Sequence, residues 1–420
     1  MLDPIARELY AEIHARPLPS VTLPSSAWQV LIKTTRTESR EMLKSFYLLN
    51  EQSPPESQPT ANSYVMQLDG CEVRLETHRE FCSFLFIQHH VDEASILDEK
   101  APYSTEWLDG LPGKLLIRNS VKLIPDHYQE IDKQRMQNYF DGERIVGSYL
   151  LNSQATVWTS FRLHNDSARY VVFVADLSSV RTGYLLQQLV EFEAYRIMAL
   201  LGFPRAKGLV QDLAKMDETL ADILRRLPDA EHHAEQELLL EITRLSTKIE
   251  ALQVDASYRF RATRAYNELV NERLANLKEE PFEEMATIST FLTRRFSPAI
   301  RTCESVQEEL NQLSTRVDSA SRLLQVRVNL SMEEQNKQLL ASMDQRGHEQ
   351  LRLQETVEGL SVAAITYYIV GLLEKLYKLS DKLPWSVDSK TLTALSIVPV
   401  ALFVWLGVRR VRTAINKKGS

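Results

Sequence analysis

The sequence predicts an α+β domain at the N-terminus, a long helical stalk with coiled-coil seams, and a two-helix transmembrane hairpin at the C-terminus. Three observations support this fold class. Strand patterns occur only in residues 1–205, and the patterns beyond Pro204 are helical. Two uncharged apolar runs, Gly359–Leu373 and Thr391–Val408, then precede a basic tail.

Residues 1–205 are predicted to mix strands and helices, because apolar and polar side chains alternate along several segments. The extended segments are Trp28–Thr34, Cys71–Val91, Lys114–Ile117, Arg144–Leu151, Thr156–Leu163 and Arg169–Phe173. Helical patterns cover Glu38–Leu49 and about Arg181–Leu201, and Gly202 and Pro204 end the second. Asn50–Asn62, which is rich in Pro, Ser, Gln and Glu, is predicted to be a polar surface loop.

The stalk is predicted from heptad spacing. Its two apolar seams are Leu238, Ile242, Leu245, Ile249 and Leu252, and Val306, Leu310, Leu313, Val317, Ala320 and Leu324. A short helix is expected over about Glu283–Phe296, and Ser297–Pro298 is typical of the start of the next helix. If that helix continues to Leu373, it is roughly 110 Å long. The seams can pair within one chain or between copies, and the sequence leaves both open.

The two apolar runs differ in how well they match a bilayer. The second is about 18 residues, or about 27 Å as a helix, close to the thickness of the hydrocarbon layer. The first is about 15 residues, and it reaches spanning length only if Val357 and Leu376–Leu379 join it, with Lys375 and Lys378 extending to the interface. A buried core helix is the alternative for the first run.

The basic tail predicts the orientation. Its cations are Arg409, Arg410, Arg412, Lys417 and Lys418. Such a cluster directly behind a membrane helix marks the cytoplasmic side, and a hairpin then places the N-terminus there too. The predicted parts are a cytosolic domain (1–205), a stalk (206–356), membrane helices (357–379 and 391–408), a short periplasmic loop (380–390) and a cytosolic tail (409–420).

Composition excludes several classes of protein. A chain of 420 residues suggests two or three domains, and its net charge of −7 argues against a nucleic-acid binder. The chain has only 13 glycines, and this low content disfavours Gly-rich phosphate loops. Three widely spaced cysteines fit a reducing cytosol. Asp3, Arg7 and Glu8 interrupt any apolar N-terminal stretch, so we expect no secretory signal there.

Several stretches resemble a family of uncharacterised bacterial membrane-anchored proteins that is catalogued as a domain of unknown function. These stretches are His14–Pro17, Glu76–Phe81, Tyr258–Tyr266, Arg294–Arg295, Thr302–Glu304, Glu334–Asn336, Gln354–Tyr368 and Val404–Arg410. The resemblance covers nearly the whole chain. It implies a multi-pass protein of the bacterial inner (plasma) membrane, with no established chemistry.

A looser resemblance, in layout only, is to the CorA-type metal ion channels. Both have a cytosolic α/β domain, a long helix running into a first membrane helix, a second membrane helix and a basic tail. The Gly-Met-Asn signature of those channels is missing, since Leu373–Tyr377 stands in its place. The similarity implies a CorA-like layout and a homo-oligomer, and the missing signature puts magnesium transport in doubt.

One weak metal-site hypothesis comes from the N-terminal domain. Glu76, His78 and Glu80 alternate, so on a strand they share one face and could bind a divalent cation, with His89 or His90 completing the set. The alternative is the polar face of a half-solvated strand. No other cofactor is evident.

The first membrane segment carries polar residues that indicate either a pore or a helix-packing seam. Ser361, Thr366, Tyr368 and Gly371 lie along it, and hydroxyl groups at membrane depth usually face other helices or water. Glu358 and Glu374 bracket the segment, about 24 Å apart along a helix. In a ring of subunits each would form a carboxylate ring, as at the mouth of a cation pore.

No spacing supports a catalytic set, so we expect no enzyme. The lipid bilayer and further copies of the chain are the expected partners; protein partners remain unknown. The leading expectation is a homo-oligomeric, membrane-anchored scaffold or sensor. The alternative is an oligomeric cation channel or transporter with a diverged selectivity region.

Overall fold

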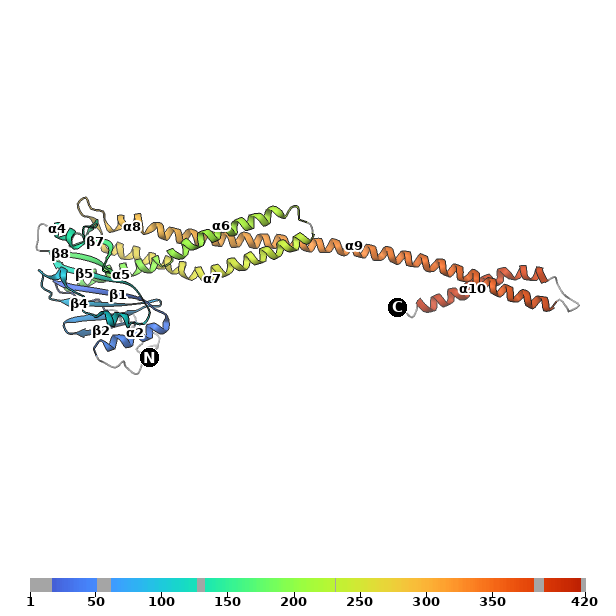
Figure 1. Cartoon of the computed structure of the whole chain (residues 1–420), viewed down its shortest axis with the longest axis horizontal. Coiled ribbons are helices and arrows are strands. Elements are labelled where there is room, and N and C mark those ends of the chain that lie inside the picture. Colours follow the sequence, from blue (N-terminus) through green and yellow to red (C-terminus); the bar gives the residue numbers. More distant parts are fainter. Residues whose placement is uncertain (1–16, 51–61, 127–132, 231, 381–388, 417–420) are drawn as a thin grey trace, which may run out of the picture. The chain divides into compact units, whose positions relative to one another are not determined.

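Nine strands form one mixed sheet, which long helices follow (Figure 1). The computed structural model describes residues 17–50, 62–126, 133–230, 232–380 and 389–416. Its strands are β1 (Ser25–Lys33), β2 (Ser63–Leu68), β3 (Cys71–Thr77), β4 (Phe81–His89), β5 (Lys114–Pro125), β6 (Val146–Leu150), β7 (Ala155–His164), β8 (Ser167–Val174) and β9 (Glu280–Pro281). Its helices are α2 (Arg36–Leu48), η1 (Ile96–Asp98), α3 (Thr105–Asp109), α4 (Lys133–Tyr139), α5 (Ser179–Leu200), α6 (Phe203–Arg226), α7 (His232–Leu277), α8 (Ile288–Arg295), α9 (Ser297–Ser380) and α10 (Ser389–Asn416). The predicted combination of a sheet domain with long helices is confirmed.

The strand order is β2-β3-β4-β1-β5-β8-β7-β6-β9. The central strands β5 and β8 run parallel, whereas the other neighbouring pairs are antiparallel. In register, Ser120 of β5 lies between Trp28 of β1 and Arg169 of β8. These three positions are therefore neighbours at the centre of the sheet.

Alternating side chains divide the sheet into two different faces. On one face, Ala27, Val121 and Tyr170 belong to a large apolar cluster that includes the buried side of α5. On the other face, strands β1, β3 and β4 form one apolar cluster with α2. A second cluster, with η1 and α4, covers β7 and β8. The second face is thus apolar at both ends and polar at its centre.

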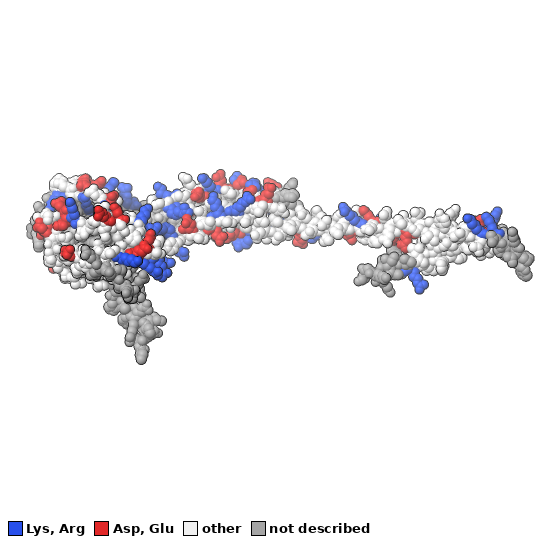
Figure 2. All heavy atoms as spheres, turned by 60° about the horizontal axis from the view of Figure 1, so that its bottom comes forward, with Lys and Arg blue, Asp and Glu red and all other residues white. Residues whose placement is uncertain are grey.

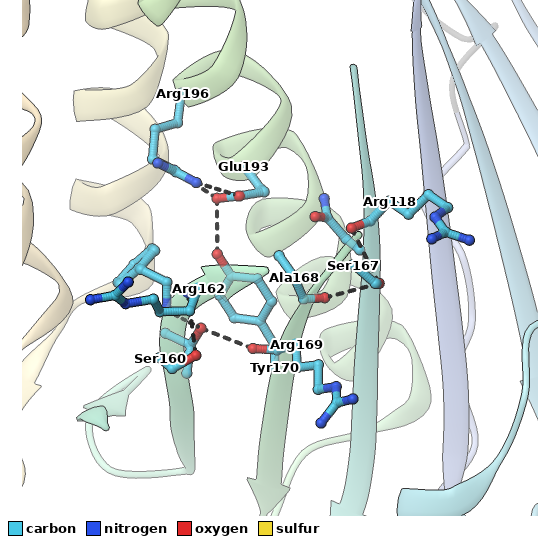
Figure 3. A network of polar contacts seen from close by, with 12 residues as sticks. Arg118, Ser160, Arg162, Ser167, Ala168, Arg169, Tyr170, Glu193 and Arg196 are labelled. Carbon is cyan, nitrogen blue, oxygen red and sulfur yellow. Dashed lines mark hydrogen bonds and ion pairs between the residues drawn. The ribbon is translucent and has the colours of Figure 1, made fainter. Parts of the chain in front are cut away.

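A buried polar network links α5 to the first face of the sheet (Figure 3). The Tyr170 hydroxyl donates to the Glu193 carboxylate at 2.9 Å, and Nε of Arg196 donates to the same oxygen at 2.8 Å. Glu193 is 0% exposed. Burial, together with the adjacent carboxylate, holds the pKa of Tyr170 well above its usual value, so the phenol stays protonated as a donor.

Contacts divide the chain into two units, residues 1–229 with 240–321, and residues 230–239 with 322–420. In the first unit, α6, α7 and the beginning of α9 carry buried seams and connecting polar contacts. Arg205 pairs with Asp255, and the side chain of Gln253 donates to Asn311 at 3.1 Å. The predicted seam residues from Ile242 to Ile249 and from Val306 to Leu324 are buried. A supercoil in the coiled-coil sense stays a prediction.

The second unit contains the rest of α9 and all of α10. α9 is a single helix of 84 residues, so it is continuous from Pro298 to Leu373, a point that the sequence leaves open. Two helices in the described part of the chain are long and apolar enough to cross a membrane, one ending at Leu376 and one over Lys390–Arg410. Figure 1 shows α10 running back alongside the end of α9.

Several element predictions need correction. A strand does follow Pro204, because β9 pairs with β6 at the sheet edge, and two residues are too short to carry a periodic pattern. β2 was not predicted, and β5 extends to Pro125, well past Ile117. The predicted loop at 50–62 and the periplasmic loop at 380–390 lie mostly outside the described residues.

Candidate functional site

A cavity of about 580 Å³ occupies the polar centre of the second sheet face. Strands β1, β5 and β8 form its floor, and residues of η1, α4 and the β7–β8 turn form its walls. Its polar side chains include Arg118, Ser120, Lys122, Tyr139, His164 and Arg169, together with Lys100 and the acidic residues Asp98, Glu99 and Asp141. This volume lies within the usual range for small-molecule sites.

Strand periodicity gathers the cations. Arg118, Ser120 and Lys122 are two residues apart on β5, so their side chains leave the same face. Arg169 stands opposite Ser120 on β8. The three basic residues therefore surround one point of the sheet.

Lys122 is 1% exposed, which is rare for a lysine. Its ammonium group donates to the hydroxyl of Ser26 at 3.2 Å and to the carbonyl of Glu99 at 3.1 Å. It also lies 4.5 Å from the ring centroid of Trp28, a cation–π contact. Burial lowers the pKa of Lys122 to about 8, although Glu99 and Asp98 act in the opposite direction.

Arg169 is held mainly by Tyr139. Its Nη1 donates to the Tyr139 carbonyl at 2.7 Å, and its guanidinium carbon lies 5.1 Å from the centroid of that ring. The Asp141 carboxylate is farther, at 3.8 Å. Burial raises the pKa of Tyr139 to about 12, so its hydroxyl is a proton donor at neutral pH.

Arg118 is held by the turn between β7 and β8. Asn165 and Asp166 have φ of 50° and 60°, as in the type I′ turns that join antiparallel strands. The carbonyls of these two residues accept hydrogen bonds from the Arg118 guanidinium. The turn thus fixes the arginine through uncharged acceptors.

One wall contains a serine, a histidine and an aspartate in sequence. Ser160 Oγ lies 3.3 Å from Nε2 of His164, whose Nδ1 contacts the Asp141 carboxylate. This is the order of contacts in a hydrolase triad, which spacing did not predict. Ser160 is 4% exposed, does not line the cavity, and accepts a hydrogen bond from the backbone of Arg162. Its hydroxyl therefore stabilises the β7 bulge and is not presented to a substrate.

The structure brings together two of the three predicted metal ligands and engages the third elsewhere. β3 ends at Thr77, so His78 and Glu80 belong to the turn before β4. Nε2 of His78 lies 3.5 Å from the Glu76 carboxylate, while Glu80 pairs with Arg259 at 3.2 Å. Within the described residues, no group of three or more His, Cys, Asp or Glu side chains is placed to hold a metal ion.

Glu80 instead joins two of the stretches that carry the family resemblance. Arg259 and the Tyr266 hydroxyl, both on α7, donate to its carboxylate at 3.2–3.3 Å. Beside them, the Arg79 guanidinium lies 5.9 Å from the ring centroid of Tyr258. We call Glu80, Arg259 and Tyr266 the latch, since it ties the β3–β4 turn to α7.

The predicted polar residues of the first membrane segment lie on different sides of α9. Thr366 is 9% exposed, and its Oγ1 has no hydrogen-bond partner among the described residues. Tyr368 is 73% exposed, and the Ser361 hydroxyl donates to the Val357 carbonyl at 2.8 Å. Gly371 and Glu358 are half-buried, and Glu374 pairs with Lys378 at 2.7 Å.

The predicted orientation residues follow directly on the second apolar run. Arg409 and Arg410 are exposed, and the Arg409 guanidinium lies 5.1 Å from the ring centroid of Trp405. Arg412 lies in α10, which ends at Asn416. Lys417 and Lys418 lie outside the described residues.

The fold and the cavity define a helix-tethered α+β domain with a polar, cation-rich site of ligand size. Residues 3–415 match the family described as "Protein of unknown function (DUF3422)", and the chain belongs to that family. The predicted membership in a family of unknown function is confirmed. No curated protein and no solved structure matches the chain, so the looser resemblance to CorA-type channels gains no support.

Proposed function

We propose that this protein is a homo-oligomeric, membrane-anchored sensor, with a cytosolic α+β domain that binds a small ligand. The observation that carries the membrane part is exposed apolar surface. Only 6% of each candidate spanning window is buried, so neither is a core helix. Leu372, Leu402 and Phe403 are among the exposed side chains. Exposure of such a large apolar surface to water is unfavourable, so a surface of this kind marks contact with lipid or with another protein.

Charge distribution supports the same proposal. In Figure 2 the visible surface of the α9–α10 pair is almost free of Lys, Arg, Asp and Glu between its ends. Arg409 and Arg410 follow the second span directly, which favours a C-terminus on the cytoplasmic side of a bacterial inner membrane. Two spans then place the sheet domain on that side too.

The oligomer proposal is supported by exposed apolar side chains on the stretch of α9 that precedes the first predicted span. Leu339, Leu340 and Met343 are 60–64% exposed there. Burying such side chains against another copy would remove apolar surface from water. The sensor proposal, in preference to a pure scaffold, is supported by the cavity, which a scaffold does not need.

Membrane extraction and thiol labelling test the anchor and its orientation. The protein should stay in the membrane fraction after an alkaline carbonate wash. Gly347→Cys and Asp388→Cys form a matched pair, since a side chain at Gly347 meets open space and Asp388 lies between the two predicted spans. An impermeant maleimide should label intact inner-membrane spheroplasts only at position 388. Release by carbonate, or labelling only at 347, contradicts the proposal.

A cation channel is the second candidate, on the strength of the polar side chains of the first span. The Glu374–Lys378 pair weakens it, because a neutralised carboxylate attracts cations less. Mass measurement in detergent tests the channel hypothesis against the sensor hypothesis, since a strict monomer excludes a pore between subunits. If a ring forms, cation flux into liposomes should be compared between wild type and Glu374→Ala.

A further inference from the structure

The cavity on β5 and β8 is lined by four basic side chains and three acidic ones, since Lys100 joins the three cations of the floor and Asp98, Glu99 and Asp141 stand against them. Arg118, Lys122 and Arg169 all line it. Within the described residues, no carboxylate lies within ion-pair distance of Arg118 or Lys122, and the Asp141 carboxylate lies 3.8 Å from Arg169. Asp141 also contacts His164, so even this counter-charge is shared.

Uncharged groups hold all three cations in place. Backbone carbonyls of the β7–β8 turn hold Arg118, and the Tyr139 carbonyl and ring hold Arg169. The Ser26 hydroxyl, the Glu99 carbonyl and the Trp28 ring hold Lys122. Such partners orient a cation without cancelling its charge, and a low local dielectric makes that charge act strongly on a ligand.

Burying a lysine costs free energy, and this one has an obvious apolar replacement. Lys122 is 1% exposed and packs on Trp28, so a methionine would fit the same space at lower cost. By contrast, the buried Arg196 on the other face has a carboxylate partner in Glu193. A buried cation with neutral partners and an adjoining cavity is arranged to meet an anion.

We propose that this cavity binds a small oxyanion-bearing molecule, with a phosphoryl group as the best match. Two arginine forks and one ammonium group suit the oxygens of a phosphate, which arginine can contact in pairs. The Tyr139 hydroxyl and Ser120 supply further donors beside them. The cavity volume accommodates a ligand the size of a mononucleotide. This inference rests on the sensor proposal, because it names the ligand class that the domain would sense.

Calorimetric titration of the full-length protein in detergent tests the inference with three probes: inorganic phosphate, AMP and citrate. Phosphate and AMP should bind, and Arg118→Gln and Arg169→Gln should each weaken binding by tenfold or more. Arg162→Gln is the matched control, because Arg162 is on β7 nearby but has a side chain 68% exposed and outside the cavity. Its affinity should equal that of the wild type.

The possible outcomes separate clearly. If citrate alone binds and depends on the same arginines, the oxyanion site stands and the phosphoryl assignment fails. If no probe binds the folded wild type, or if Arg118→Gln and Arg169→Gln bind as tightly as the control, the site is refuted. Circular dichroism of each variant checks folding, so that lost binding is scored only for a folded protein. Carbonate washing of the same preparations tests the membrane anchor independently. A protein that stays in the membrane but binds none of the three probes refutes only this inference and leaves the proposed anchor intact.

Discussion

The two faces of the central sheet treat buried cations in opposite ways. On the α5 face, Arg196 meets the fully buried Glu193, and the pair closes with Tyr170 (Figure 3). On the other face, Lys122 is 1% exposed, its hydrogen-bond partners are neutral, and the Asp98 and Glu99 carboxylates act on it only from beyond ion-pair distance. The comparison indicates that a compensated charge holds elements together, whereas an uncompensated one beside a cavity is available to a ligand.

The largest expected effect comes from removing the buried negative charge. Glu193→Gln leaves Arg196, whose side chain is 14% exposed, without its counter-charge. We expect the free energy of unfolding to fall by about 3–5 kcal/mol. Chemical denaturation followed by tryptophan fluorescence measures it.

The control for that variant is Glu143→Gln, which removes the partner of Arg162 at the surface. Both side chains of that pair are well exposed, at 41% and 68%, so the loss should be at most about 1 kcal/mol. Equal losses of unfolding free energy in the two variants would mean that burial does not strengthen the Glu193–Arg196 ion pair.

Lys122 should give the sheet domain an unusual dependence on pH. Its pKa is about 8 in the folded protein and 10.5 as the ordinary value, so between these pH values the unfolded chain binds more protons. Stability from this group therefore rises with pH over that window, by about 3 kcal/mol in total. Lys122→Met should remove this contribution, so the difference in unfolding free energy between wild type and variant should grow with pH over that window; a difference that stays constant would contradict the assignment.

The latch between the β3–β4 turn and α7 should have an intermediate effect. Glu80 and Arg259 are only 13–14% exposed, and their hydrogen bonds are charge-assisted. Glu80→Gln should cost about 1–3 kcal/mol. A double-mutant cycle with Arg259→Gln isolates the pair, and additive losses would show that the two residues are not coupled.

The smallest effect is expected at Ser160. Its hydroxyl contacts His164 and the backbone of Arg162, so Ser160→Ala should cost about 1 kcal/mol. Because the hydroxyl is buried, a fluorophosphonate probe should not label the wild type. Labelling that disappears in Ser160→Ala would instead establish a catalytic serine.

The sequence predicts most of the fold because alternation and helical periodicity are long-range patterns. Alternation predicts β3, β-rich composition predicts β1, and an apolar run predicts β4. The break between α5 and α6 follows from Gly202 and Pro204. β5 was predicted only to Ile117, because the polar residues that follow interrupt the apolar pattern. Three of those residues, Arg118, Ser120 and Lys122, line the cavity.

The site could not be predicted for the same reason. Its parts come from β1, β5, α4, β8 and the β7–β8 turn, and only the strand order brings them together. Polar residues at alternate positions inside an otherwise buried strand were the one available signal. Of the predicted metal ligands, Glu80 does not join Glu76 and His78, because β3 ends at Thr77 and the alternation does not continue past it. The anion site thus depends on register, which sequence patterns do not fix.

The most direct test of the account is the affinity for AMP as a function of pH. The second pKa of a phosphomonoester is about 6, so AMP is a dianion from pH 7 to 9.5. Changes in its affinity over this range therefore report on titration of the protein. If the Lys122 ammonium group contacts the anion, affinity should be constant below about pH 8 and should fall at least several-fold by pH 9.5. Lys122→Met should bind more weakly and show no such fall. An affinity that is independent of pH in the wild type, or that rises with it, would contradict the account.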